Sequence, residues 1–185
     1  MTVLRIVRAN FVRAGEELVA PFDLDLRCGE RATHFSADAR AAALTARIAA
    51  AVVKPTTGSA YVADFDTRLQ AAQAKRCVAF VPANESEPGN FARALDFYAA
   101  AFDLERGETL RRAGEVTAVL GHGLYARNAA LALCHETSLI VLERPAPGVV
   151  ETLALLRPRA AILCSHVAPG NLETRAGERA VEALR

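Results

Sequence analysis

The stretch Gly29–Val52, GERATHFSADARAAALTARIAAAV, decides the fold. We predict a short strand over residues 31–35 and a helix over residues 39–53, because alanine, which dominates the second part, has the highest helix propensity. A strand, a loop and a helix in this order form the usual frame in which a helix N-terminus holds a phosphate. Here the loop contains no glycine, and no lysine begins the helix. Ser36 or Asp38 is therefore predicted as a simple N-cap of the helix.

The segments before this stretch alternate between apolar and charged side chains. We predict strands over residues 2–7 and 17–26. From Phe22 to Leu26 every other residue is apolar and its neighbours are charged, as expected where one face of a sheet is buried. Residues 54–66 begin with a turn rich in proline and glycine and continue as a strand. The N-terminal part therefore predicts antiparallel strands.

The rest of the chain alternates between helices and apolar strands. SLIVLE (138–143) is a continuous apolar run that ends in an acid, which is typical of a central strand in a parallel sheet. Helices that alternate with such strands indicate an α/β fold with a mostly parallel core. We also predict strands at 76–82 and 160–166, a polar loop at 83–90, helices at 91–104, 124–136 and 149–158, and a polar helix over the tail, 171–185.

Composition limits the size and the partners of the protein. A length of 185 residues with 52% hydrophobic residues suggests one domain, residues 1–185, with a sizeable core. The 22 Lys and Arg residues nearly balance the 21 Asp and Glu residues, which argues against nucleic acid as a partner. The sequence has no apolar run long enough to span a membrane and no signal-peptide block at the N-terminus, so we expect a cytoplasmic protein.

The four cysteines do not indicate a metal site or a disulfide framework. Cys164 and His166 are the closest pair of possible zinc ligands, and two ligands separated by one residue do not make a site. No metal site is predicted. Since no C-x-x-C motif occurs, we expect reduced, mostly buried thiols at Cys28, Cys77, Cys134 and Cys164.

Five segments follow one another in the order of a known family: FDLDLRCGE (22–30), KPTTGSAYVADFD (54–66), RCVAFVP (76–82), ARNAALALCHETSLIVLERPAPG (126–148) and AILCSH (161–166). They resemble, in turn, the stretch before the phosphate loop, the P-x-x-G turn, the strand entering the glutamine loop, the Walker B region and the switch-histidine strand of ATP-binding cassette (ABC) nucleotide-binding domains. The resemblance covers nearly the whole chain. It implies a P-loop NTPase-like α/β fold: a mixed sheet with a parallel core, antiparallel N-terminal strands and a small helical subdomain, placed at residues 83–123.

The stretch that matches the phosphate loop of the family, Ser36–Leu44, lacks the required residues. In the pattern G-x-x-x-x-G-K-[ST], backbone N–H groups cradle the phosphates, the lysine reaches the outer phosphates, and the hydroxyl binds magnesium. Here Arg40 could replace the lysine charge, but its head is longer and planar, and Asp38 would repel a phosphate. We therefore treat Ser36, Asp38 and Arg40 as remnants of a phosphate loop.

The Walker B strand of the family ends in Asp-Glu-Pro, whose aspartate binds magnesium and whose glutamate polarises the attacking water. The matching residues here are Glu143, Arg144 and Pro145. Glu143 keeps a carboxylate, but the cation of Arg144 cannot act as a general base at neutral pH. These two residues could instead form ion pairs within the fold. His166 matches the switch histidine, although one histidine alone does not make a site and could simply be hydrogen-bonded at a strand end.

The signature motif of the family, Leu-Ser-Gly-Gly-Gln, matches residues 119–123. Leu120 replaces the serine, and His122 replaces a glycine. Gly121 and Gly123 keep a flexible backbone beside His122, so the stretch is predicted either as a glycine turn that caps a helix or as a remnant in which His122 contacts an anion of a partner.

The glutamine loop and the helix after it match the part of the family that contacts the membrane subunit. Ala83 stands in place of the glutamine, and Asn84 beside it is a weak substitute. The loop 83–90 leads into the helix 91–104, which carries more aromatic side chains than one buried face needs. These side chains are predicted either as a docking surface or as part of the helical core: Phe91, Phe97, Tyr98 and Phe102.

The resemblance with its altered motifs implies a degenerate ABC-type subunit that does not hydrolyse ATP and acts as a structural or regulatory partner in a transport complex. Its expected partners are an ABC membrane subunit, a second cassette subunit in a hetero- or homodimer, or both, which would hold it at the inner face of the membrane. No cofactor is expected. The alternative is a divergent, active ABC ATPase that binds ATP and magnesium and uses Arg40, Glu143 and His166 in altered roles.

Overall fold

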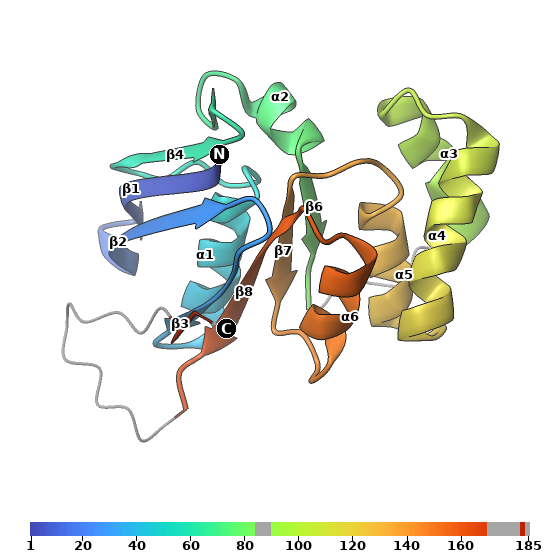
Figure 1. Ribbon diagram of the computed structural model, residues 1–185. Coiled ribbons are helices and arrows are strands. Elements are labelled where there is room, and N and C mark those ends of the chain that lie inside the picture. Colours follow the sequence, from blue (N-terminus) through green and yellow to red (C-terminus); the bar gives the residue numbers. More distant parts are fainter. Residues whose placement is uncertain (84–89, 170–181, 184–185) are drawn as a thin grey trace.

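Two sheets organise the part of the chain that the computed structural model describes, residues 1–83, 90–169 and 182–183 (Figure 1). In chain order its elements are β1 (Thr2–Arg13), β2 (Glu16–Arg27), β3 (Arg31–Ser36), α1 (Ala39–Ala49), β4 (Ser59–Val62), β5 (Phe65–Asp66), α2 (Ala71–Arg76), β6 (Val78–Val81), α3 (Phe91–Ala101), α4 (Arg106–Leu120), α5 (Leu124–Ala132), β7 (Leu139–Glu143), α6 (Val149–Leu156), β8 (Ala161–Val167) and β9 (Glu182–Ala183).

The first sheet is antiparallel, with the strand order β2-β1-β4-β5. Its long hairpin, β1 and β2, turns at Gly15, whose φ of 82° lies in the left-handed region that suits glycine. Leu4 pairs with Leu26, and both are buried. The next pair, Arg5 and Asp25, is exposed. The alternation predicted for the N-terminal strands is therefore confirmed, and its apolar face is turned toward the interior.

The second sheet has the strand order β6-β7-β8-β3-β9, and β6, β7, β8 and β3 run parallel. Every residue of β7 is buried, which explains its uninterrupted apolar sequence. Glu182–Ala183 form β9, which pairs antiparallel with β3. The helix predicted for residues 171–185 is therefore wrong at these two residues, because the backbone of β3 offers an edge to which a short strand can pair. The rest of that tail lies outside the described residues.

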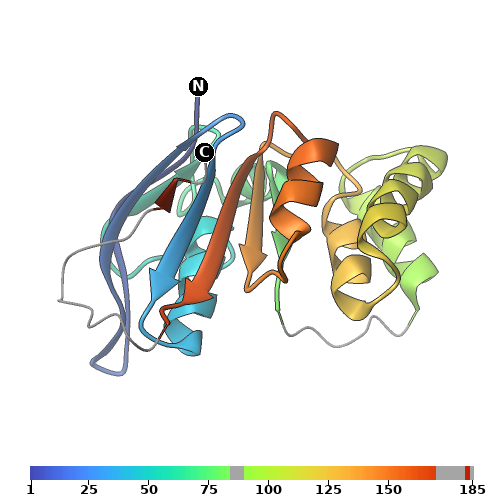
Figure 2. The same cartoon turned by 60° about the horizontal axis from the view of Figure 1, so that its bottom comes forward.

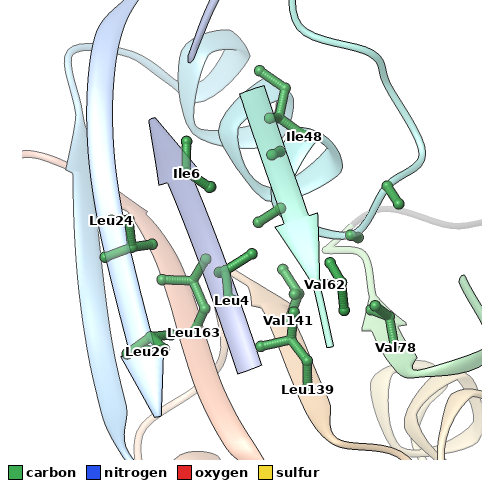
Figure 3. Close-up of a cluster of buried hydrophobic side chains, with 14 of the residues drawn as sticks. Leu4, Ile6, Leu24, Leu26, Ile48, Val62, Val78, Leu139, Val141 and Leu163 are labelled. Atoms are coloured by element: carbon green, nitrogen blue, oxygen red, sulfur yellow. The ribbon is translucent and has the colours of Figure 1, made fainter. Parts of the chain in front are cut away.

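The helix α1 lies between the two sheets (Figure 1). Ala46, Ile48 and Ala49 are fully buried in a cluster that contains strand residues from both sheets. Figure 3 shows Ile48 of α1 in this cluster, with Leu4 of the antiparallel sheet and Leu163 of the parallel sheet. Alanine side chains are small enough to let the helix approach the strands closely. The alanine-rich sequence therefore serves packing as well as helix propensity.

Helices cover the other face of the parallel sheet (Figure 2). Because neighbouring residues of a strand point to opposite faces, Leu139 and Val141 pack on the side of α1, whereas Ile140 and Leu142 pack on the helical side. The helices α3 and α4 fall within residues 83–123, the predicted helical subdomain. Each helix of this face contributes a buried side chain: Leu95 from α3, Val116 from α4, Leu131 from α5 and Leu153 from α6.

The helix α4 is not predicted as a separate helix by the sequence, because it contains two glycines and few apolar residues. Its N-cap, Glu105, accepts hydrogen bonds from the backbone N–H groups of Gly107 and Glu108. Further along, Glu108 forms ion pairs with Arg111 and Arg112, at the spacings that stabilise helices. Capping and charge pairing thus outweigh the low propensity. None of the helices in the described residues has the length and hydrophobicity needed to cross a bilayer.

Candidate functional site

The parallel strands bring several predicted site residues to one edge of the sheet. Glu143 at the end of β7 lies opposite Ser165 of β8, and His166 lies opposite Phe35 of β3. Because α1 begins two residues after β3, its N-terminus lies at the same edge. Ligands of α/β proteins bind at this edge of the sheet. We call the following residues the carboxyl edge: Ser36, Asp38, Glu143, Arg144, Ser165 and His166.

Asp38 closes the N-terminus of α1. Its Oδ1 atom accepts a hydrogen bond from the backbone N–H of Ala41 at 2.8 Å. Of the two residues considered as N-cap, Asp38 is therefore the one that caps the helix. A carboxylate here places a negative charge where a helix N-terminus would otherwise attract an anion. Only Ala37 and Asp38 connect β3 to α1, so the connection is too short to curl around a phosphate group.

Ser36 and Arg40 are engaged by separate neighbours. Ser36 is buried, its hydroxyl lies 3.4 Å from Nδ1 of His34, and its carbonyl accepts a hydrogen bond from the N–H of Ala168. The guanidinium of Arg40 lies 3.9 Å from the carboxylate of Glu16, and both side chains are exposed. Such a surface pair is weak. The structure therefore does not gather Ser36 and Arg40 around a common point.

Glu143 and Arg144 pair with each other at the end of β7. Glu143 is 4% exposed, and its Oε1 atom lies 3.6 Å from Nη2 of Arg144. The backbone of Arg144 has a φ of 47°, which is uncommon for a residue with a side chain, and its N–H donates a hydrogen bond to the carbonyl of Ser165 at 2.9 Å. An ion pair within the fold, one of the two interpretations of these residues, is thus present.

The last residues of β8 connect the sheet to α1 and to β3. Ser165 is fully buried, and its hydroxyl donates a hydrogen bond to the carbonyl of Ala42 in α1 at 2.8 Å. The half-buried ring of His166 lies against the ring of Phe35, with 6.2 Å between the ring centroids. Burial lowers the pKa of His166 from its ordinary value, since the charged imidazolium is disfavoured. Among the described residues no hydrogen bond reaches this ring, so packing holds it.

Tyr125 is a neighbour of this edge that the sequence does not single out. Its hydroxyl is buried and has no hydrogen-bond partner among the described residues. Burial raises the pKa of Tyr125 well above its ordinary value, and the nearby groups of Cys164 and Glu143 act in the same direction. The phenol therefore stays protonated. A tyrosine in the first turn of a helix gives no sequence signal for such a position.

Comparison with known proteins identifies the architecture. No family model and no curated protein matches the sequence. The fold, in contrast, superposes on an ATP-binding subunit of an ABC transporter with a TM-score of 0.68 at 14% identity, over 89% of this chain and 80% of that one. A dimeric ATP-binding cassette in a post-hydrolysis state with ADP and phosphate superposes with a TM-score of 0.69 at 12% identity, over 88% and 87% of the two chains. The chain has the fold of an ABC nucleotide-binding domain.

A third solved structure of the ABC fold is CbiO1 of Clostridium perfringens, which is part of an ABC transporter complex. It superposes with a TM-score of 0.65 at 16% identity, over 89% of this chain and 78% of that one. The expected α/β fold with its parallel core and antiparallel N-terminal strands is therefore confirmed. Sequence identities this low establish the fold alone, and the roles of individual residues must be argued from their surroundings.

Residues 121–123, in the stretch predicted to match the ABC signature motif, form a turn between two helices. Gly121, with a φ of 83°, is the C-cap of α4, and Gly123 is the N-cap of α5. His122 lies exposed between them. The turn thus has the helix-capping geometry considered for this stretch. It leaves the side chain of His122 accessible to a partner, and it belongs to the helical part of the ABC fold and not to the carboxyl edge.

The aromatic side chains of α3 have different surroundings. Phe97 is 70% exposed, and its ring makes an edge contact with Tyr98. Phe91 and Tyr98 pack against the core of the helical face. Phe102 stacks on His135, with 3.9 Å between the ring centroids and 10° between the ring planes. Of the residues predicted to dock a partner, Phe97 alone is thus mainly exposed. Residues 84–89 of the loop before α3, including Asn84, lie outside the described residues.

His135 faces a cavity that the sequence does not predict. We call it the His135 cavity; its volume is about 200 Å³, and its wall includes Lys75, Phe80, Tyr98, Phe102, Asn128 and His135. His135 is 3% exposed; the backbone of Val78 acts on its ring as a hydrogen-bond partner, but neither ring nitrogen forms a well-aligned hydrogen bond within the described residues. Burial lowers the pKa of His135 to about 4, against a smaller opposing effect from the backbone of Val78. The ring is therefore neutral at pH 7.

Metal ligands do not gather anywhere in the described residues: no group of three His, Cys, Asp or Glu side chains could hold an ion. Cys28 is exposed, Cys77 is partly buried, and Cys134 and Cys164 are buried. Burial raises the pKa of Cys134 to about 11 and that of Cys164 to about 12. These two thiols therefore remain protonated at neutral pH and are poor metal ligands and poor nucleophiles.

Proposed function

We propose that this protein is an ABC-type subunit that does not hydrolyse ATP and that serves as a structural or regulatory partner in an ABC transport complex. The observation that carries this proposal is the pair of Glu143 and Arg144, whose charged groups lie 3.6 Å apart at the end of β7. Phosphoryl transfer to water requires a carboxylate that holds magnesium and a base that orients the water. Here the carboxylate is paired with a guanidinium, and a guanidinium cannot accept a proton at neutral pH.

The N-terminus of α1 does not fit the phosphates of ATP either. The carboxylate of Asp38 already accepts the hydrogen bond of the Ala41 N–H at 2.8 Å, so a phosphate would meet both a negative charge and an occupied donor. The cation that could compensate, Arg40, is directed to Glu16. Neither ATP nor magnesium fits the residues present, and we derive no catalytic step from them.

The exposed apolar side chains of the helical part support docking to a partner. Phe97 of α3 is 70% exposed, Val119 of α4 is 49% exposed, and Leu124 of α5 is 42% exposed. Apolar surface of this kind marks interaction sites when it is contiguous. Solved proteins of the same fold include part of an ABC transporter complex and a dimeric cassette. We therefore propose an ABC membrane subunit, a second cassette subunit or both as partners, and attachment to the membrane through them.

Nucleotide titration tests the proposal. The purified chain is titrated with ATP by isothermal titration calorimetry, with and without magnesium, and phosphate release is measured in parallel with an intact ABC ATPase as positive control. We expect no binding at millimolar ATP and no release. The variant Arg144→Glu should also be inactive, because a new base has no bound phosphate or magnesium to act on. Micromolar binding, or magnesium-dependent release that Glu143→Gln abolishes, would show that the alternative, an active ABC ATPase, is right.

A further inference from the structure

The His135 cavity lies away from the carboxyl edge, between β6, α3 and α5. Its volume of about 200 Å³ is room for roughly six or seven water molecules at about 30 Å³ each. This is the size of one six-membered ring with a small substituent. Tyr98 of α3 and Phe102, which caps the C-terminus of α3, provide flat walls, and Phe80 of β6 adds a third aromatic ring. Planar walls of this kind favour a planar occupant.

His135 supplies a polar group that the protein pairs only weakly. It is 3% exposed; the backbone of Val78 is close enough to act on the ring as a hydrogen-bond partner, but no well-aligned hydrogen bond within the described residues reaches Nδ1 or Nε2. Its ring cannot turn freely, because it stacks on Phe102 at 3.9 Å. A neutral imidazole presents one N–H donor and one nitrogen acceptor. Buried polar groups without partners are rare in native proteins, and an occupant of the cavity that donates or accepts a hydrogen bond would account for this one.

The other polar groups of the cavity define its preference for charge. Asn128 is 6% exposed, and its amide can both donate and accept a hydrogen bond. Lys75 is exposed at the cavity wall and carries the ammonium group. No lining residue is acidic, and His135 is neutral, so Lys75 provides the net charge of the cavity. An anionic substituent near Lys75 is therefore favoured.

We propose that the His135 cavity binds a single-ring heteroaromatic carboxylate. The ring lies against the aromatic walls, its heteroatom exchanges a hydrogen bond with His135 or Asn128, and its carboxylate is directed to Lys75. Small-molecule sites combine apolar walls with a few convergent polar groups, and this cavity contains both. The proposal shares no residue with the carboxyl edge and does not depend on whether the protein hydrolyses ATP.

Titration of the intact chain with the three pyridine monocarboxylates (picolinate, nicotinate and isonicotinate) tests this proposal. Binding is measured by calorimetry and by the NMR signals of the His135 imidazole. Benzoate keeps the ring and the charge without the heteroatom, and nicotinamide keeps the heteroatom without the charge. We expect at least one pyridine carboxylate to shift the His135 signals and to bind about fivefold or more tightly than benzoate and nicotinamide, since each control loses one polar contact.

Matched variants locate the binding. His135→Phe keeps an aromatic ring against Phe102 and should weaken binding at least about tenfold, while Lys75→Gln should weaken it about threefold to tenfold. Lys54→Gln changes an exposed residue that does not line the cavity, and this variant should bind as the unmodified chain does. The proposal is overturned if no pyridine carboxylate binds below ~10 mM, the weakest affinity expected for a ligand of this size. Equal binding by benzoate, or unchanged binding by a folded His135→Phe variant, would also overturn it.

Discussion

The carboxyl edge and the His135 cavity differ in how their polar side chains are paired. At the edge, exposed Asp38 and buried Ser165 each form a hydrogen bond of 2.8 Å within the chain. In the cavity, neither ring nitrogen of His135 forms a well-aligned hydrogen bond within the described residues. An unpaired buried group costs about 1–3 kcal/mol. The hydrogen bonds of Asp38 and Ser165 therefore contribute to the stability of the fold, whereas the weakly paired imidazole of His135 is available to an occupant of the cavity.

The hydrogen bonds of the carboxyl edge join separate elements. Ser165 connects β8 to α1 through the carbonyl of Ala42, and the backbone N–H of Arg144 connects the end of β7 to β8. These hydrogen bonds hold the helix and the strands together. Substitutions at the carboxyl edge should therefore change the free energy of unfolding more than they change the binding of a ligand.

The largest effect on the free energy of unfolding is expected for the buried residue that precedes the carboxyl edge in β7. Leu142, the residue before Glu143, is fully buried on the helical side of the sheet. Leu142→Ala should lower the free energy of unfolding by about 3 kcal/mol, because it removes apolar contacts and leaves a cavity. Chemical denaturation measures the change. The control, Leu155→Ala, changes a side chain that is 84% exposed and should have almost no effect; equal losses at the two positions would contradict the assigned burial.

The second effect concerns pH and the cavity. The pKa of His135 falls from 6.5 to about 4 on folding, so the unfolded chain binds more protons between these values. The contribution of His135 to the free energy of unfolding is therefore complete above pH 6.5, where the ring is neutral in both states. As the pH falls from 6.5 toward 4, the free energy of unfolding decreases by an amount on the order of 2–3 kcal/mol. Calorimetric melting from pH 7.5 to 4 measures it. In His135→Phe this decrease in stability at low pH should be smaller. The decrease that remains comes from His166, whose pKa is also lowered by burial. Parallel curves for the two proteins would refute the assignment.

The third effect tests the edge as a structural element. Asp38→Ala removes the N-cap of α1 and should destabilise the protein by about 1 kcal/mol. Asp25→Ala, on the exposed face of β2, is the control and should change the melting temperature little. If Asp38→Ala instead bound ATP with micromolar affinity, the carboxylate would be the element that blocks an otherwise competent phosphate site.

The fourth effect tests the cavity at neutral pH. His135→Phe replaces the two unpaired nitrogens by carbon and keeps a ring that can stack on Phe102. It should raise the free energy of unfolding by about 1 kcal/mol, since the penalty for the unpaired group disappears. Thermal melting at pH 7.5 measures the gain, with His122→Phe at the exposed turn as control. A destabilised His135→Phe would mean that the imidazole has a partner in the folded protein.

The sequence predicts the fold better than it predicts the side-chain arrangement at the carboxyl edge or in the His135 cavity. The alanine-rich helix and the run LIVLE (139–143) are recognisable because periodicity and propensity are local properties. The helix α4 is missed because its stability comes from capping at Glu105 and from ion pairs, which outweigh its glycines. In the ABC resemblance, the order of the segments suffices to bring Glu143 and His166 to one edge.

The surroundings of single side chains are less predictable. His135 is predicted within the helix 124–136, but the helix ends at Ala132, and the sequence gives no sign of the cavity. The contact with Phe102 and the cavity itself join segments from residues 50 to 135. The burial of the Tyr125 hydroxyl near Glu143 is likewise not predictable from the sequence, because it depends on how α5 packs on the strands. Pairings between distant segments depend on tertiary packing, which a local pattern does not contain.

The smallest effect on the isolated chain is expected at Phe97. Its side chain is 70% exposed, so Phe97→Ser should change the free energy of unfolding by less than about 0.5 kcal/mol. Phe102→Ser is the matched control on the same helix; it removes the ring that stacks on His135 and should cost about 2–3 kcal/mol. The difference between the two separates apolar surface that faces a partner from apolar surface that builds the cavity.

Association is the decisive readout for Phe97. If the helical part docks on a membrane subunit or a second cassette, Phe97→Ser should release the protein from the membrane fraction of its native cells, or from its oligomer in gel filtration, while the melting temperature stays unchanged. A loss of stability at Phe97→Ser would show that the ring packs within the fold. Unchanged association with unchanged stability would remove α3 as a docking surface and leave the remaining exposed apolar residues, such as Val119, to be tested in the same way.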